Sequence, residues 1–291
     1  DLIGFGQCEK PSLTFTQYLW ESYTAAFMKE VALGTKDWDS FVIGGNSIGG
    51  YTTMSFAADD GVVANEDSTS ETDAVTVSAS GASGSGRCKG LILMNSAGKV
   101  FKNGEVENLT TDTGIITVAE ATASGRIGES SPPPRMVANV GGEGLLWYLR
   151  PRIQSICVNL YPTNPTAVDN TLCSGILRDS LDPGAINVMI SGSKLPPPRT
   201  ANELLGADFG SSINKEYNKN QTTFNESTFD GPVLVAQGFL DPLNDAKGRA
   251  EMFGGLRDGI TVNPINAGHC PHDELPDEIA KSISSWLSVT L

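Results

Sequence analysis

The chain has 291 residues, of which 39% are hydrophobic, so it can bury a core as one large domain or as a domain with an insertion. Its formal net charge is −14, and Lys and Arg form no cluster. This argues against a nucleic-acid-binding surface, because phosphate neutralisation needs grouped cations. No segment is apolar over the length that a transmembrane helix requires. Strand-like and helix-like runs alternate, which predicts an α/β protein with a largely parallel sheet.

The cysteines and glycines give no sign of a metal or nucleotide site. The chain has five cysteines, scattered and without a CxxC pair: Cys8, Cys88, Cys157, Cys173 and Cys270. This spacing is not typical of a disulfide framework or a zinc site, so we expect free, mostly buried thiols in a reducing compartment. The run "VIGGNSIGG" lacks a GxGxxG fingerprint with a matching acid after the next strand. We therefore expect neither a cofactor nor a metal.

The first predicted elements lie between residues 14 and 58. Apolar side chains at spacings of three and four predict a helix over residues 14–31, with one apolar face: Phe15, Tyr18, Leu19, Tyr23, Phe27 and Val31. A strand over "SFVIGG" follows, then a sharp turn through Asn46 and Ser47, and then a second helix over "GGYTTMSFAA". This order places Ser47 at the end of a strand.

A long middle region divides the predicted core. Residues 59–89 are rich in Ser, Gly and acids and predict an acidic surface loop within the first part of the core, residues 1–98. "GLILMNSAG", residues 90–98, predicts a short buried strand. Residues 99–230 combine weak strand signals, helical patches and proline-rich breaks, which indicate an inserted domain. One run there has near-helical spacing, and Pro151 must start or kink a helix within it: Leu145, Leu146, Leu149, Ile153, Ile156 and Leu160.

The strand pattern returns in residues 231–291, the second part of the core. "PVLVAQG" (232–238) and "GITVNPINAG" (259–268) predict strands. The chain closes with a predicted helix in which Pro276 and two acids occupy the first turn, where the helix dipole favours negative charge. The predicted apolar face of this helix comprises Ile279, Ile283, Trp286 and Leu287.

Ser47 is the candidate nucleophile. It lies in the GxSxG pattern Gly45-Asn46-Ser47-Ile48-Gly49, between the predicted strand and the predicted helix. A tight strand-to-helix turn needs small neighbours, because a side chain two positions away would meet the adjacent strand or helix. Gly45 and Gly49 meet this need. The backbone N–H of Ile48 would supply one donor to an oxyanion.

A serine nucleophile needs a base and an acid. The chain has two histidines, His269 and His272, and both follow the last predicted strand. We predict His269 as the base, because Gly268 lets the backbone bend the imidazole toward the sheet edge, and His272 is the alternative. Asp241 follows the penultimate strand and is the predicted acid, with Asp245 as the substitute.

The order of these residues and several longer motifs resemble one family. Ser47, Asp241 and His269 follow the Ser–acid–His order of α/β-hydrolases, each at the carboxyl end of its own predicted strand. "DLIGFGQCEKP", "GNSIGG", "GFLDPLND" and "AGHCPHDELPDEI" resemble the plant and algal α/β-hydrolases related to pheophytinase, near haloalkane dehalogenases and epoxide hydrolases. The resemblance covers most of residues 1–58 and 232–291.

The resemblance implies an α/β-hydrolase fold in which residues 99–230 form a helical cap over the active site. A serine at position 47, where the dehalogenase relatives carry an aspartate, implies hydrolysis of a carboxylic ester through an acyl-enzyme. An apolar cap favours a lipophilic small-molecule substrate, such as a phytyl or acyl ester. The relatives are plastid proteins, which implies a chloroplast location.

Family members also carry early strands and a loop that donates the second oxyanion N–H before the equivalent of Asp1. We expect these elements to be absent from this chain. A second hypothesis follows from that absence: a catalytically weak or inactive hydrolase-fold protein that serves as an interaction subunit of a membrane assembly, such as a photosynthetic assembly of the thylakoid.

Overall fold

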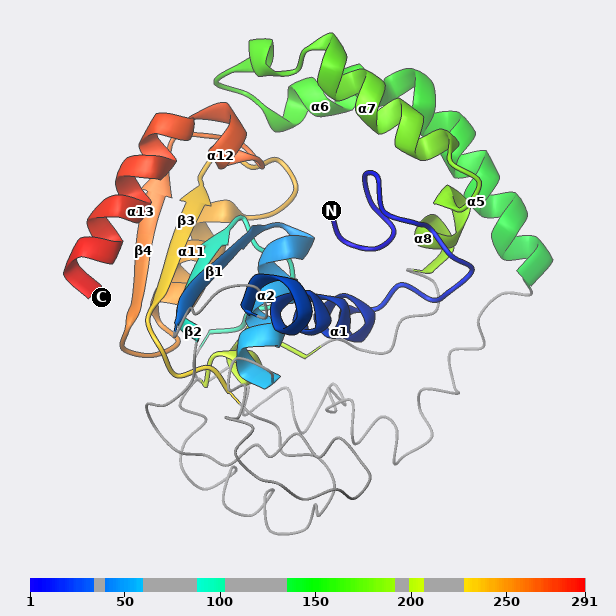
Figure 1. The fold of residues 1–291 in the computed structure, drawn as a ribbon. Coiled ribbons are helices and arrows are strands. Elements are labelled where there is room, and N and C mark those ends of the chain that lie inside the picture. The colour runs from blue at the N-terminus through cyan, green and yellow to red at the C-terminus, as the bar shows by residue number, and fades with distance from the viewer. Residues whose placement is uncertain (34–39, 60–87, 103–134, 192–198, 207–227, 291) are drawn as a thin grey trace, which may run out of the picture.

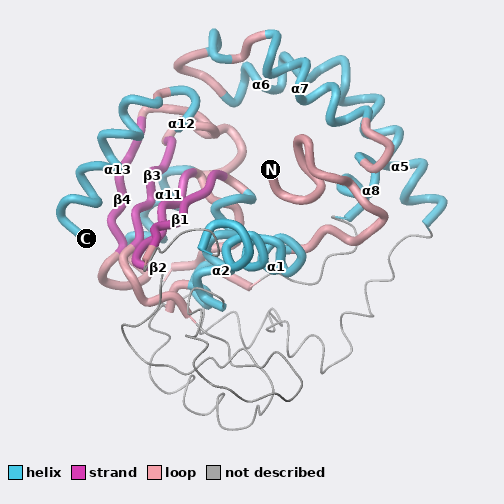
Figure 2. Tube along the Cα trace, viewed as in Figure 1, coloured by secondary structure: helices cyan, strands magenta, loops and turns pink. Residues whose placement is uncertain are grey.

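The centre of the structure is a parallel β-sheet. The computed structural model describes residues 1–33, 40–59, 88–102, 135–191, 199–206 and 228–290. Within them the strands pair in the order β1-β2-β3-β4, and every pair is parallel (Figures 1 and 2). The strands are β1 (Phe41–Asn46), β2 (Cys88–Met94), β3 (Val233–Gly238) and β4 (Ile260–Ile265). The predicted α/β class with a parallel sheet is confirmed.

The register of the strands aligns their carboxyl ends. Asn46 pairs with Met94, and Met94 pairs with Ala236. Gly238, the last residue of β3, pairs with Ile265, the last residue of β4. Because the strands run in one direction, the residues that follow them meet at one edge of the sheet. Every predicted catalytic side chain follows one of these ends.

Helices cover both faces of the sheet. On one face, α2 (Ile48–Asp59) and α11 (Ala246–Gly254) pack on alternate residues of the inner strands. The opposite face is covered by α13 (Pro276–Thr290), whose Ile279 and Trp286 are buried. β2 and β3 are therefore apolar on both faces, as is typical of parallel strands between two helical layers.

Another group of helices lies beyond the sheet and forms an arc in Figure 1. We call it the helical layer, and its members are α5 (Arg135–Leu149), α6 (Ile153–Leu160), α7 (Asn170–Leu181) and α8 (Ala185–Ser191). Pro151 lies in a 3₁₀ turn, Arg150–Arg152, between α5 and α6, so the predicted break is confirmed. Lys10 joins the N-terminal segment to this layer through an ion pair with Asp182 at 2.6 Å.

The first helix buries a different face from the predicted one. The helix α1 spans Gln17–Phe27, and its buried residues are Gln17, Trp20 and Glu21. Phe27 and Val31 of the predicted apolar face are about half exposed, at 50% and 48%. The reason is that α1 packs on α2, where Glu21 accepts a hydrogen bond from the buried hydroxyl of Ser55. A buried polar contact, which apolar periodicity does not detect, fixes the packed face.

Several predicted boundaries shift by a few residues. Residues 60–87 of the predicted acidic loop lie outside the described residues, and Cys88 already begins β2. The strand predicted over 90–98 ends at Met94, because Asn95 turns the chain with a φ of 41°. The strand predicted over 259–268 ends at Ile265. The closing helix and its buried face are confirmed.

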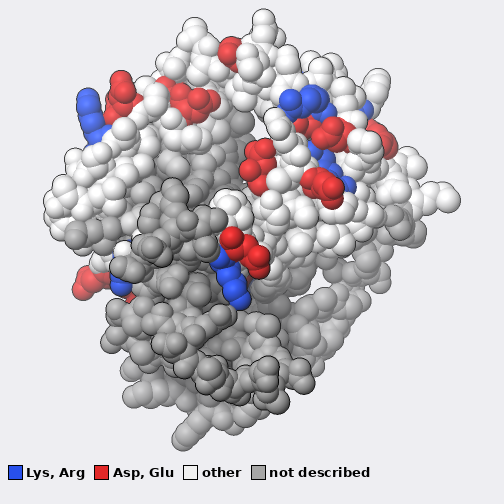
Figure 3. All heavy atoms as spheres, in the orientation of Figure 1, with Lys and Arg blue, Asp and Glu red and all other residues white. Residues whose placement is uncertain are grey.

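Short elements complete the described fold. They are a π-helix (Met28–Leu33), a 3₁₀ turn (Pro165–Ala167), α9 (Ala201–Leu204) and α12 (Pro271–Glu274). Ala201 and Leu204 of α9 belong to the same apolar cluster as the sheet and α2, so this end of the predicted insertion packs in the core. None of the helices that the structure describes combines the length and apolar character required to span a bilayer. On the face shown in Figure 3, acidic and basic side chains of the described residues are interspersed.

Candidate active site

Ser47 sits on a sharp turn between β1 and α2. Its φ is 53°, in the left-handed region that residues other than glycine rarely adopt. The turn is held by β2 and the loop after it: the Ser47 N–H donates to Met94 O at 3.0 Å, and the Ala97 N–H donates to Ser47 O at 2.8 Å. Strained backbone of this kind is typical of a serine presented at the top of a sheet.

The glycines around Ser47 are not equivalent. A Cβ at Gly45 would lie 2.3 Å from the carbonyl carbon of Gly49, so no side chain fits at position 45. A Cβ at Gly49 would meet no described atom within 4 Å. Gly50 is the second crowded position, because its Cβ would lie 2.9 Å from Gly45 O and from the Ser96 side chain. The predicted need for space is correct for Gly45 and wrong for Gly49.

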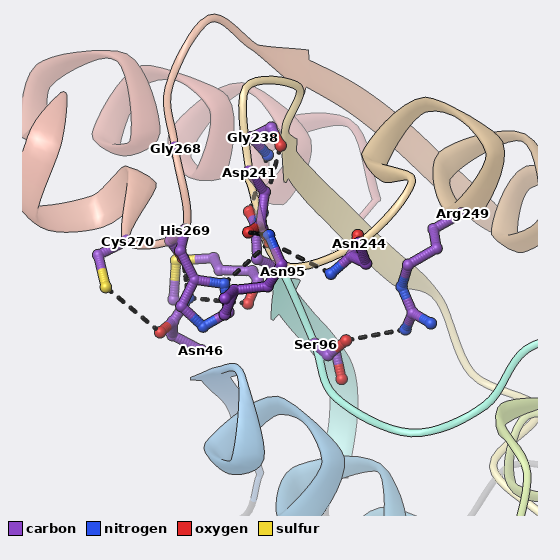
Figure 4. A network of polar contacts seen from close by, with 12 residues as sticks. Asn46, Asn95, Ser96, Gly238, Asp241, Asn244, Arg249, Gly268, His269 and Cys270 are labelled. Carbon is purple, nitrogen blue, oxygen red and sulfur yellow. Dashed lines mark hydrogen bonds and ion pairs between the residues drawn. The ribbon is translucent and has the colours of Figure 1, made fainter. Parts of the chain in front are cut away.

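Asp241 and His269 form a buried pair at the same edge of the sheet (Figure 4). Asp241 Oδ2 lies 2.8 Å from His269 Nδ1. Both residues are buried, with 5% and 9% of their surface exposed. This contact fixes the orientation of the imidazole. Asp241 engages Nδ1, so the other ring nitrogen, Nε2, is not used in this contact.

Asp241 is surrounded by hydrogen-bond donors. Its Oδ2 accepts from Asn95 Nδ2 at 2.8 Å and from Asn244 Nδ2 at 3.3 Å, and its Oδ1 accepts from the Leu243 N–H at 2.9 Å. Burial raises the pKa of Asp241, but the hydrogen bonds from His269, Asn95 and Leu243 outweigh burial, and the net pKa lies below the ordinary value. Asp241 therefore stays ionised beside His269 at neutral pH.

The main chain of His269 is held from two sides. Asn46 Nδ2 donates to His269 O at 2.8 Å, and the same amide group donates to Met94 O at 3.0 Å. The His269 N–H donates to Leu160 O, at the end of α6, at 2.9 Å. Asn46 thus ties the turn that carries Ser47 to the loop that carries His269, and Leu160 ties that loop to the helical layer.

Gly268 is required for a different reason from the one predicted. Its φ is not positive, unlike that of Gly259, so it does not supply an unusual bend. A Cβ at Gly268 would instead lie 2.1 Å from Leu160 O and 2.4 Å from Pro162 Cδ. Glycine here allows the loop of His269 to approach the helical layer.

Glu274 joins the same two parts of the chain. It is 1% exposed, and its carboxylate accepts hydrogen bonds from the N–H groups of Gly268, Thr163 and Asn164 and from the Thr163 hydroxyl. Nearby, Tyr161 donates to Asp273 Oδ2 at 2.8 Å. A buried carboxylate is stable here because backbone and hydroxyl donors satisfy its oxygens.

The structure places the two alternative residues elsewhere. Asp245 caps α11 by accepting the N–H of Gly248 at 3.1 Å, so its carboxylate is engaged at a helix terminus. His272 is exposed on α12, and no hydrogen bond joins it to Asp241 within the described chain. The geometry therefore brings together Asp241 and His269 from the predicted set.

Ser47 Oγ makes no hydrogen bond to His269 in the part of the chain that the structure describes. Nucleophile and base are often loosely placed in unliganded enzymes and approach one another when substrate binds. The Ile48 N–H opens α2 and therefore has no acceptor within the helix, so it can donate to a negative oxygen beside Ser47.

Sequence reasoning missed four polar residues of this edge: Asn46, Asn95, Arg249 and Glu274. Asn46 follows the strand predicted over "SFVIGG", and Asn95 lies within the strand predicted over residues 90–98. In the structure Asn46 ends β1 and Asn95 directly follows β2, positions from which a side chain can reach the neighbouring strand ends. Arg249 Nη2 donates to Ser96 O at 2.8 Å, and no short motif marks that contact. Glu274 looks like a first-turn helix acid in the sequence, so its burial could not be foreseen.

Comparison with known proteins identifies the fold. No family model matches the chain, and no curated protein matches it. Several solved structures are similar to it. The chain is similar to the epoxide hydrolase CorEH with a TM-score of 0.54 and 15% identity, over 99% of this chain and 80% of that chain. It is similar to a thermophilic esterase from Thermogutta terrifontis with a TM-score of 0.51 and 20% identity, over 100% of this chain and 78% of that chain.

A third similar structure is the enol-lactonase from Burkholderia xenovorans LB400, with a TM-score of 0.51 and 14% identity, over 99% of this chain and 79% of that chain. At these identities the similarity shows the fold alone. The chain has the α/β-hydrolase fold, which confirms the predicted architecture.

The elbow glycines give a matched pair of variants. We expect Gly45→Ala to lower the free energy of unfolding by about 1–3 kcal/mol, because the new methyl group overlaps the backbone of Gly49. Gly49→Ala should leave it unchanged or raise it by up to about 1 kcal/mol, since alanine favours the helix and space is free. Urea unfolding followed by circular dichroism measures both values. Equal losses in the two variants would contradict the asymmetry.

The lowered pKa of Asp241 predicts an acid-dependent stability. Its ionised carboxylate stabilises the fold above the unfolded-state pKa of about 3.9, and this stabilisation is lost as the pH falls through the lower folded-state pKa. We expect Asp241→Asn to weaken the pH dependence of the unfolding free energy below about pH 5, in urea titrations at several pH values. Asp258→Asn, which changes an exposed carboxylate, is the control and should keep the wild-type slope. An unchanged slope in Asp241→Asn would refute the assignment.

Proposed function

We propose that the protein is a serine hydrolase that cleaves a carboxylic ester through an acyl-enzyme on Ser47. The observation that carries this proposal is the placement of Ser47, at a φ of 53° on a strand-to-helix turn, at the same sheet edge as the buried pair of Asp241 and His269. The similar solved structures include an esterase and an enol-lactonase, which supports a hydrolase. In this proposal His269 is the base and Asp241 the acid.

The proposed reaction needs a proton acceptor and an oxyanion donor. Ser47 Oγ attacks the ester carbonyl carbon while its proton passes to His269 Nε2, and Asp241 stabilises the imidazolium. The carbonyl oxygen becomes negative and accepts the Ile48 N–H. The tetrahedral intermediate collapses by breaking the bond to the alkoxy oxygen, which leaves as an alcohol with the proton from His269. Water then attacks the acyl-enzyme, with His269 as base, and releases the carboxylic acid.

Within the described residues, one donor is assigned to the oxyanion. Ile48 supplies one donor, and the described residues offer no second N–H assigned to this role. Loss of one oxyanion donor lowers kcat by about 10²–10³ in serine hydrolases. The chain spans 78–80% of the length of the similar structures. Acylation and deacylation both form an oxyanion, so in this proposal the Ile48 N–H assists both steps.

The surroundings of the pair favour a lipophilic ester. Ile48 beside Ser47, and Leu240 and Leu243 beside Asp241, are exposed at 37%, 43% and 61%. Ile48 begins α2 directly after Ser47, and Leu240 and Leu243 flank Asp241 in the loop after β3, so we propose that an apolar substrate group contacts these exposed side chains. A phytyl or long acyl ester is the proposed substrate class.

The finer assignments rest on sequence resemblance alone. They are the pheophytinase-like branch and the plastid location. The alternative role as an interaction subunit of a membrane assembly rests instead on the expected absence of the second oxyanion donor. Each stays a prediction.

Labelling with a fluorophosphonate tests the proposed nucleophile. We expect the wild-type chain to gain one covalent phosphonyl group on Ser47, as read by intact mass and peptide mass spectrometry, because the probe traps an activated serine. Ser47→Ala should gain none. Ser96→Ala is the matched control, since Ser96 is a second serine at this edge of the sheet, two residues past the end of β2, and it should label like wild type. An unlabelled wild type, under conditions that label a known serine hydrolase, would refute the proposal.

The substrate class is tested with p-nitrophenyl esters of increasing acyl length. We expect kcat/KM to rise at least about tenfold from acetate to octanoate, since each buried methylene contributes roughly 0.8 kcal/mol. Leu243→Ser should reduce this rise while leaving acetate hydrolysis nearly unchanged. A flat series in wild type would reject the lipophilic substrate and leave the ester hydrolase itself in place.

A further inference from the structure

We propose that Asn95 is a positioning residue for the reaction, because it holds the Asp241 carboxylate where His269 Nδ1 meets it. This inference rests on the proposed function and names a residue outside the predicted Ser–acid–His set. Asn95 contacts neither Ser47 Oγ nor the His269 ring by a hydrogen bond in the described chain, so it acts through Asp241.

The side chain of Asn95 is hydrogen-bonded to the end of β3. It directly follows β2, it is 1% exposed, and its Oδ1 accepts the Gly238 N–H at 2.8 Å (Figure 4). Its Nδ2 donates to Gly238 O at 3.2 Å and to Asp241 Oδ2 at 2.8 Å. Gly238 is the last residue of β3, and the loop that carries Asp241 starts there. The amide thus fixes the carboxylate relative to the strand that bears it.

Asn95 and His269 contact the same carboxylate oxygen of Asp241. Asp241 Oδ2 lies 2.8 Å from both Asn95 Nδ2 and His269 Nδ1. An amide donor on this oxygen restricts rotation of the carboxylate and withdraws charge from it, so the carboxylate attracts the proton of His269 less strongly. Among the described residues, Arg249 and Cys270 also interact electrostatically with Asp241.

The backbone conformation at Asn95 and the close packing at Gly238 both suit an asparagine at position 95. Its φ is 41°, in the left-handed region where asparagine is tolerated better than most residues. Gly238 cannot carry a Cβ, which would lie 2.1 Å from Gly268 O and 3.1 Å from Asn95 Oδ1. The ends of β2 and β3 and the loop of His269 therefore meet tightly around the Asn95 amide.

The chain offers a matched control for Asn95. Asn202 is fully buried, and like Asn95 its amide makes two hydrogen bonds to the backbone of one residue. Its Oδ1 accepts the Phe101 N–H at 2.9 Å, and its Nδ2 donates to Phe101 O at 3.0 Å. Within the described chain it makes no hydrogen bond to Asp241 or His269, so Asn202→Ala removes a similar pair of hydrogen bonds away from the site. The test variants are Asn95→Ala and Asn95→Gly. Glycine adopts a positive φ freely, so Asn95→Gly removes the amide without straining the backbone.

The experiment compares three readouts in the wild type and these variants. Ester kinetics at several pH values give kcat and KM, and proton NMR reports the His269 Nδ1–H resonance. We expect both Asn95 variants to lose about 10- to 100-fold in kcat with little change in KM, since a misplaced base slows the reaction rather than binding. The rising limb of kcat/KM should move to higher pH, because a carboxylate without its amide donor stabilises the imidazolium more. The Nδ1–H resonance should shift.

Asn202→Ala should keep the wild-type kcat, rising limb and resonance, with only a loss of stability in urea unfolding. Wild-type kcat and resonance in Asn95→Gly would overturn the inference. So would equal changes in Asn202→Ala. If the wild type fails to label on Ser47 and cleaves no ester, the proposed function fails, and the resonance still decides the inference: a shift confined to the Asn95 variants supports it, and no shift overturns it.

Discussion

The shared direction of β1, β2, β3 and β4 is the constraint on which the candidate site depends. Parallel pairing delivers the end of every strand to one edge, and the register brings β3 and β4 two residues further than β1 and β2. Asn46 and His269, 223 positions apart in the sequence, are therefore within hydrogen-bond distance. A shift of one strand against its neighbour would separate the groups that polar side chains now hold together.

The strand ends are held by hydrogen bonds to backbone groups as much as by contacts between the predicted catalytic side chains. Ser47 and Asn95 both adopt positive φ, a conformation that costs of order 1–3 kcal/mol and persists only where neighbours over-determine it. The neighbours are the adjacent strand ends: Met94 O accepts from Ser47, and Gly238 exchanges two hydrogen bonds with Asn95. Packing of the sheet thus supports strain at the two turns next to the Asp241 and His269 pair.

The sequence predicted the positions of the candidate site residues where a short local motif or the end of a strand determines them. A strand, a glycine-flanked serine and a helix predicted the turn at Ser47, and strand ends predicted where Asp241 and His269 would lie. Apolar periodicity failed at α1, because the buried Glu21 contacts Ser55 from another helix. It could not identify Glu274 either, whose donors come from residues 111 positions away, such as Thr163. Satisfied buried polar groups depend on tertiary partners, and a single sequence does not show those partners.

The loop of His269 also depends on the helical layer. The His269 N–H binds Leu160 O, and Glu274 binds Thr163 and Asn164, so the segment after α6 is anchored on this loop by several hydrogen bonds. Displacing that segment would leave the Glu274 carboxylate buried without its donors, which is unfavourable. In Figure 1 the α5 end of the layer lies far from this anchor. The end of the helical layer near α6 is thus fixed to the loop that carries His269.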